Sequence, residues 1–274
     1  MPEGPEIKRA ADHIASAIVY QPLQEVWFAF PHLKKHEAQL GASQIQQVET
    51  RGKGLLMHFD CGLSIYSHNH QLYGKWMIRK AYNYPQTKRQ LRLALHCDRK
   101  SALLYSASDI DVLDAAGIQV HPFLSRIGPD VLSSKTTVDQ VQERLSCRRF
   151  RRRRLTTLLL DQHFLAGLGN YLRSEILFVA RVHPSLRPMD CTSEQLEKLA
   201  EAALALPRQS YETGGITNDI AWAAKLKSQG FTRRVYRHWV FARAGQLCWV
   251  CATPIVKAAQ GGRRYYYCPQ CQEE

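Results

Sequence analysis

The first residues of the chain, MPEGPE, place a proline directly behind the initiator methionine and a glutamate after it. Removal of Met1 would leave Pro2 as a secondary amine with a pKa of roughly 8, so that an appreciable fraction is neutral near pH 7. A neutral amine is a nucleophile. The structural alternative is that Pro2 and Glu3 merely precede and begin a helix.

Four cysteines near the C-terminus form two CxxC pairs, CWVC and CPQC, with sixteen residues between the pairs. This spacing is typical of a tetrahedral zinc site on a β-hairpin ribbon, and the alternatives are a redox pair or unpaired thiols. Four thiolates leave no open coordination position, so the predicted zinc is structural and a zinc hydrolase is excluded. The predicted ligands are Cys248, Cys251, Cys268 and Cys271.

Three further motifs carry polar groups that suit nucleic acid. Arg263 and Arg264 lie between the two cysteine pairs, where they could hold phosphate or serve only as part of the ribbon. In LAGLGNYLRSE, Asn170 is a good N-cap for a helix whose free N–H groups would attract a phosphate. The run RRFRRRR, residues 148–154, fits a solvated face, a localisation signal or a strip that contacts a nucleic-acid backbone.

The segment SHNHQLYG contains Gln71, Leu72 and Tyr73 at what reads as the loop after a strand. A polar, an aliphatic and an aromatic side chain on one loop form a set that can wedge into a stack of bases. The ordinary alternative is that Leu72 and Tyr73 cover the sheet.

The net charge of +13, from 37 basic and 24 acidic residues, favours a polyanionic partner over an uninvolved basic surface. Cysteines scattered singly outside the cluster fit a reducing cytosol better than a disulfide framework. No apolar run is long enough to cross a membrane, and the N-terminus lacks the pattern of an export signal. We therefore expect a soluble, cytoplasmic protein.

The pattern of apolar residues predicts an α+β protein in which helices flank and follow a β-rich half. Residues 6–18 have helical spacing, and residues 23–106 alternate in short runs broken by turn signals such as RGKG. This predicts an antiparallel sandwich or barrel. Helical spacing returns after HPFLSRIGPDVL, and a Gly- and Lys-containing linker leads to the cysteines.

Taken in order, MPEGPE, ETRGKGLL, SHN with QLYG, HPFLSRIGPD, FLAGLGNYLRSEIL and the cysteine ribbon closely resemble one family. It is the family of bacterial DNA glycosylase/AP lyases that includes formamidopyrimidine-DNA glycosylase and endonuclease VIII. The resemblance spans the whole chain, and MPEGPE and QLYG are more similar to the endonuclease VIII branch.

The resemblance implies four parts. These are an N-terminal antiparallel β-sandwich with flanking helices over 1–125, a helix-two-turn-helix domain over 126–213, a linker or lesion-facing loop over 214–238, and a zinc-finger ribbon over 239–274. The implied activity is bifunctional. Such an enzyme excises an oxidised base and then cleaves the strand by β,δ-elimination through an imine on the N-terminal proline.

The resemblance also assigns residues. The catalytic set is Pro2, Glu3, Lys53 and Arg263, with Arg264 as a rival to Arg263, and the DNA-binding set is Gln71, Leu72, Tyr73, Arg126 and Asn170. The implied partner is double-stranded DNA with damaged bases or abasic sites, bound by a monomer with no membrane association in the bacterial cytoplasm, at the nucleoid.

The sequence departs from the family pattern at two places, of which the first affects the register of the wedge loop and the second the choice of substrate. His70 is an extra residue before QLYG, and the linker before the ribbon is longer than in endonuclease VIII. We predict oxidised pyrimidines as substrates, with oxidised purines such as 8-oxoguanine or formamidopyrimidines as the alternative. A non-enzymatic zinc-ribbon protein that binds distorted DNA is the rival from another class, but it leaves MPEGPE and RGKG unexplained.

Overall fold

The computed structural model describes residues 2–68 and 74–273, and these divide into two compact units. The first unit comprises Pro2 and residues 6–126 apart from the gap, and the second comprises residues 3–5 and 127–273. Each unit has its own hydrophobic core, so each is described by itself.

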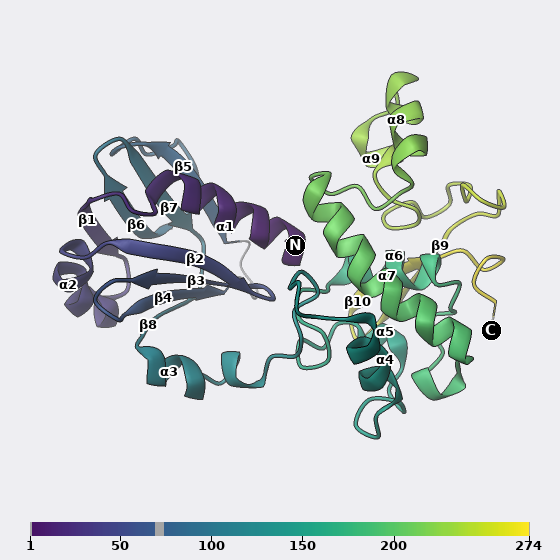
Figure 1. The fold of residues 1–274 in the computed structure, drawn as a ribbon. Coiled ribbons are helices and arrows are strands. Elements are labelled where there is room, and N and C mark those ends of the chain that lie inside the picture. The colour runs from purple at the N-terminus through teal and green to yellow at the C-terminus, as the bar shows by residue number, and fades with distance from the viewer. Residues whose placement is uncertain (1, 69–73, 274) are drawn as a thin grey trace. The chain divides into compact units, whose positions relative to one another are not determined.

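Two antiparallel four-stranded sheets form the first unit, with strand orders β1-β6-β7-β5 and β2-β3-β4-β8 (Figure 1). The strands are β1 (Leu23–Phe28), β2 (Ile45–Arg51), β3 (Gly54–Phe59), β4 (Ser64–His68), β5 (Lys75–Lys80), β6 (Leu91–Cys97), β7 (Lys100–Tyr105) and β8 (Asp109–Leu113). Both sheets bury side chains in one shared cluster, including Phe28, Leu95 and Met57. The predicted antiparallel β-sandwich is therefore confirmed.

Helix α1 (Gly4–Ile18) closes this core with the apolar face that its sequence predicts. Ile7, Ala11, Ile14 and Ile18 are buried in the sandwich cluster. The short elements α2 (Glu37–Gly41), α3 (Ala115–Val120) and the 3-10 helices η1 (Pro31–His36) and η2 (Leu124–Arg126) complete the unit. Strands β2, β5 and β8 and these short helices were not individually predicted, because their apolar periodicity is weak.

The second unit contains helices around a core that is separate from the sandwich. They are α4 (Val138–Ser146), α5 (Leu155–Leu158), α6 (Asn170–Val179), α7 (Ser193–Glu212), α8 (Ile220–Ser228) and α9 (Arg233–Tyr236), with the 3-10 helix η3 (Pro188–Asp190). Strands β9 (Val256–Gln260) and β10 (Arg263–Tyr267) form an antiparallel hairpin at the end of the chain. Residues Tyr171 to Phe178 of α6 are all buried, so α6 is the central helix of this unit.

Two short helices form within the stretch predicted to be a linker. Asp219 caps α8 by accepting a hydrogen bond from the Trp222 N–H at 2.7 Å. Ala223 and Leu226 of α8 pack with Tyr236 of α9 in a small buried cluster. The sequence AWAAKLK consists mostly of strong helix formers, so local propensity and this cluster order the stretch.

Within residues 2–68 and 74–273, no helix combines the length and the apolar composition that crossing a bilayer requires.

Candidate active site and zinc centre

A pocket of about 280 Å³ in the first unit brings Pro2 and Lys53 together. Lys53 occupies the tip of the β2–β3 hairpin, where Arg51 pairs with Gly54 and Gly52 takes a positive φ of 61°. Positive φ is what a two-residue hairpin turn requires, so the RGKG sequence fixes where Lys53 is presented. The pocket is lined by residues of α1, the hairpin, β4 and β5 and by Arg89.

This pocket is also basic. Its charged lining residues are Lys53, Lys75 and Arg89, with Glu6 as the acidic one. Three cations beside one carboxylate favour a phosphate-bearing substrate. Lys75 and Arg89 were not among the predicted site residues, because neither belongs to a motif whose spacing indicates a chemical role.

In the second unit the Glu3 side chain is buried against the N-terminus of α6. Its two carboxylate oxygens accept hydrogen bonds from the Tyr171 N–H at 2.8 Å and the Leu172 N–H at 3.3 Å. Glu3 is only 3% exposed. The positive end of the helix dipole also favours a negative charge here, so the carboxylate is held in one orientation.

Glycines make room for this arrangement. A Cβ on Gly169 would lie 2.4 Å from the Glu3 Cδ, a separation that atoms cannot adopt. The Gly4 N–H also donates to the Gly167 carbonyl at 2.8 Å, which ties the N-terminal residues to the LAGLGN turn. Gly169 of LAGLGN therefore admits the Glu3 carboxylate.

The sequence-based interpretation of Asn170 needs correction. Gly169 occupies the N-cap position, and Asn170 is the first residue of α6. Two of the N–H groups predicted to be free for a phosphate are occupied by Glu3. Sequence spacing could not reveal this, because Glu3 is more than 160 residues away along the chain.

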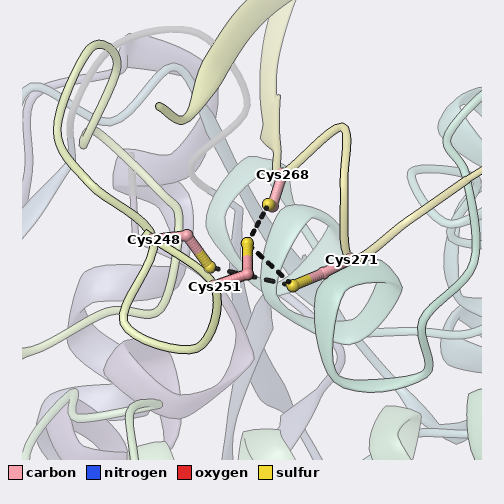
Figure 2. A group of neighbouring side chains, drawn as sticks. All are labelled: Cys248, Cys251, Cys268 and Cys271. Atoms are coloured by element: carbon pink, nitrogen blue, oxygen red, sulfur yellow. Dashed lines mark hydrogen bonds between the residues drawn. The ribbon is translucent and has the colours of Figure 1, made fainter. Parts of the chain in front are cut away.

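The four clustered cysteines are placed for one tetrahedral metal ion (Figure 2). Their sulfur atoms all lie within 4.8 Å of one another, with 3.9 Å between Cys248 and Cys271 and 3.4 Å between Cys251 and Cys268. Zn–S bonds of about 2.3 Å in a tetrahedron require sulfur separations of about 3.8 Å. The donor set and its geometry therefore fit zinc.

Arg263 and Arg264 begin strand β10, and both are exposed. The two-residue turn before them is Gly261-Gly262, with φ values of 57° and 73°, as a type I′ hairpin turn requires. The hairpin is fixed to α6, because Arg173 donates to the Arg264 carbonyl at 2.9 Å. The arginines of the ribbon are thus displayed on an anchored backbone.

Arg173 is a residue that the sequence analysis did not single out. It is 1% exposed and also donates to the Thr156 carbonyl at 2.7 Å. Burial lowers its pKa to about 10, while the charge of Glu3 opposes that shift. The available signal was two charged residues, Arg173 and Glu175, among the apolar residues of NYLRSEIL, because charged side chains in a buried helix need partners.

Among the remaining predicted residues, the structure describes only Arg126. Arg126 is exposed at the end of η2, where its Nε donates to the Pro122 carbonyl at 2.8 Å. Gln71, Leu72 and Tyr73, together with His70, lie outside the described residues.

Family sequence models match three parts of the chain. The formamidopyrimidine-DNA glycosylase N-terminal domain matches residues 1–108, the formamidopyrimidine-DNA glycosylase H2TH domain matches residues 127–221, and the zinc finger found in FPG and IleRS matches residues 245–273. Together with the sulfur geometry, the last match shows that the four cysteines hold one structural zinc ion.

Full-length relatives agree with these matches. The chain is 47% identical to Endonuclease 8 of Pectobacterium carotovorum and 48% identical to Endonuclease 8 of Escherichia coli, in both cases over 99% of this chain and 100% of the relative. A crystal structure of Lactococcus lactis Fpg (MutM) with DNA containing an oxidised pyrimidine aligns with a TM-score of 0.82 at 20% identity, over the full length of both chains. The resemblance read from the motifs is therefore confirmed, and the chain belongs to the formamidopyrimidine-DNA glycosylase and endonuclease 8 family of base-excision-repair enzymes, which are DNA glycosylases with AP lyase activity.

Proposed function

We propose that this enzyme uses Pro2 as the nucleophile that excises oxidised pyrimidines from double-stranded DNA and cleaves the strand by β,δ-elimination. The observation that carries the proposal is the pocket in which Pro2 lies with Lys53, Lys75 and Arg89. An amine nucleophile and a cationic lining are what attack on a phosphate-flanked sugar requires.

The chemistry follows from a secondary amine. After removal of Met1, the neutral nitrogen of Pro2 attacks C1′ of the flipped nucleotide, and the base departs with the glycosidic bond electrons and takes up a proton. Opening of the sugar gives a cationic imine between Pro2 and C1′. The imine withdraws electrons, so a proton is lost from C2′ and the 3′ phosphate leaves. A second elimination releases the 5′ phosphate, and water frees the amine.

Glu3 is the general acid/base in this scheme. Covalent adjacency limits the distance between its carboxylate and the Pro2 nitrogen, and the N–H groups of Tyr171 and Leu172 fix its orientation. An oriented carboxylate can protonate the sugar oxygen during ring opening and accept the proton back later.

The other assigned residues act on DNA. Lys53 assists base loss and elimination, and Arg263 contacts the phosphate released by δ-elimination, with Arg264 beside it as its rival. Arg126 and Asn170 contact the DNA backbone in this proposal. Gln71, Leu72 and Tyr73 fill the gap left by the flipped nucleotide.

Borohydride trapping tests the nucleophile. With duplex DNA that contains an abasic site, borohydride should reduce the imine and yield a stable protein–DNA adduct, and peptide mass mapping should place it on a mature N-terminus that begins at Pro2. An adduct on Lys53 would overturn the assignment. The absence of any adduct would contradict the imine mechanism.

Damaged pyrimidines are the expected substrates because flipping them costs less. A pyrimidine saturated across its 5,6 bond is not planar and stacks poorly, whereas 8-oxoguanine is flat and stacks well. In single-turnover assays on otherwise identical duplexes, we expect thymine glycol or dihydrouracil to be excised at least about tenfold faster than 8-oxoguanine opposite cytosine, or roughly 1.4 kcal/mol in barrier. Faster excision of 8-oxoguanine would assign the oxidised-purine preference while leaving the Pro2 chemistry intact.

The proposal places the enzyme on bacterial DNA as a monomer in the cytoplasm. It rests on the bacterial origin of the relatives and on the net charge of +13, which suits a polyanion.

A further inference from the structure

The segment Arg148–Arg154 connects α4 to α5 and contains six arginines in seven residues. Five of them are exposed and are called the arginine strip here: Arg148, Arg149, Arg151, Arg152 and Arg154. The sixth, Arg153, forms an ion pair with Asp161. The strip is therefore a local concentration of positive charge in the second unit.

A run of like charges usually repels itself into a disordered tail, but this one is part of the folded unit. Phe150, in the middle of the run, is 2% exposed, and its ring centroid lies 5.1 Å from that of Phe164 in an edge-to-face arrangement. The guanidinium groups of Arg144 and Arg149 each lie 5.1 Å from the Phe150 ring. Phe150 therefore anchors the segment in the core while its neighbours face solvent.

Backbone hydrogen bonds hold the segment on both sides of this anchor. The Arg151 N–H donates to the Cys147 carbonyl at 3.0 Å, and the Arg151 carbonyl accepts from the Met189 N–H at 3.1 Å. Further along, the Leu155 N–H donates to the Leu186 carbonyl at 2.9 Å. The strip thus keeps its charges together on a fixed backbone, at a cost in self-repulsion that a bound anion would relieve.

The strip ends beside the hairpin that bears Arg263 and Arg264. The buried guanidinium of Arg173 donates both to the Thr156 carbonyl at 2.7 Å and to the Arg264 carbonyl at 2.9 Å. The Thr156 hydroxyl is also hydrogen-bonded to the side chain of Gln260 in β9. Helix α5, which directly follows the arginine strip, and the β9–β10 hairpin are therefore joined within one unit.

We propose that the arginine strip is a second surface for the DNA backbone, next to the hairpin arginines, that holds phosphates beyond the nucleotide under repair. The inference rests on the proposed action on double-stranded DNA. Guanidinium groups suit this partner because each can donate two parallel hydrogen bonds to one phosphate. The preordered backbone reduces the entropy lost on binding.

The test compares the salt dependence of binding to a duplex with a non-cleavable abasic-site analogue. The full-length variant Arg148→Gln/Arg151→Gln/Arg152→Gln leaves the Arg149 contact with Phe150 and the Arg153–Asp161 ion pair in place. The slope of log K against log salt is negative, and each lost phosphate contact should make it less negative by about 0.9. We therefore expect a slope that is less negative by about 1 to 3 and at least about tenfold weaker binding at low salt.

The matched control removes three exposed lysines from the first unit, as Lys34→Gln/Lys35→Gln/Lys100→Gln. An unchanged slope in the arginine variant, or an equal reduction in the control, would overturn the proposal. Thermal unfolding midpoints close to wild type would show that both variants fold. Borohydride trapping of the wild type separates the two proposals, because its failure would contradict the Pro2 chemistry whatever the slopes show.

Discussion

Glu3→Gln is expected to slow base excision by at least about 100-fold in single-turnover assays, because it removes the proposed general acid/base. Cleavage of preformed abasic sites should be impaired less, since no glycosidic bond remains to be broken. The glutamine side chain also fits poorly against the N-terminus of α6. The carboxylate offers one oxygen to each of the N–H groups of Tyr171 and Leu172, whereas glutamine has one oxygen and would turn its NH₂ toward the second donor.

A glycine variant tests the same idea with the carboxylate retained. Gly169→Ala would place a Cβ 2.4 Å from the Glu3 Cδ and should displace the side chain, so excision should fall as it does in Glu3→Gln. Gly41→Ala is the matched control, because a Cβ there meets nothing within 4 Å and should leave excision unchanged. Full excision by Gly169→Ala, or equal loss by Glu3→Gln on both substrates, would contradict the role assigned to Glu3.

Cys268→Ser is expected to lose the zinc ion and DNA affinity together. The thiol is fully buried, and the Sγ atom of Cys251 lies 3.4 Å from it, so a hydroxyl in its place would leave the metal with three thiolates. Structural zinc contributes about 10–16 kcal/mol of apparent binding free energy in zinc-finger peptides, which indicates how strongly the ribbon depends on the metal. Arg263 and Arg264 lie on β10, which ends directly before Cys268, and would lose their fixed position.

Zinc content and the dissociation constant for abasic-site duplex measure this outcome. The loss should be local, because the core of α4, α6 and α7 does not include the ribbon, so the helical signal in circular dichroism should persist. Cys61→Ser is the control, since Cys61 is an exposed cysteine outside the cluster, and it should keep one zinc and normal affinity. Full DNA cleavage by zinc-free protein would refute the structural role of the metal.

Features that depend on neighbouring residues could be predicted from the amino-acid sequence. The CxxC pairs identify the zinc ligands, because a local turn brings the two cysteines of each pair to the same metal ion. The alternation of apolar residues predicts the sandwich strands because side chains point to opposite faces of a sheet. RGKG predicts a hairpin with Lys53 at its tip because the turn needs a glycine with positive φ. Pro2 is a candidate nucleophile from its position alone.

Features that join distant segments became visible only in the folded chain. Glu3 accepts hydrogen bonds from N–H groups of α6 that the sequence analysis expected to be free for a phosphate. Buried Arg173 donates hydrogen bonds to the carbonyls of Thr156 and Arg264. The physical reason is that a buried charge must be paired with whatever donors or acceptors the fold brings to it, however far apart they lie along the chain. Local patterns reveal which residues have a chemical capacity, but only the packing of α6 shows which partners orient them.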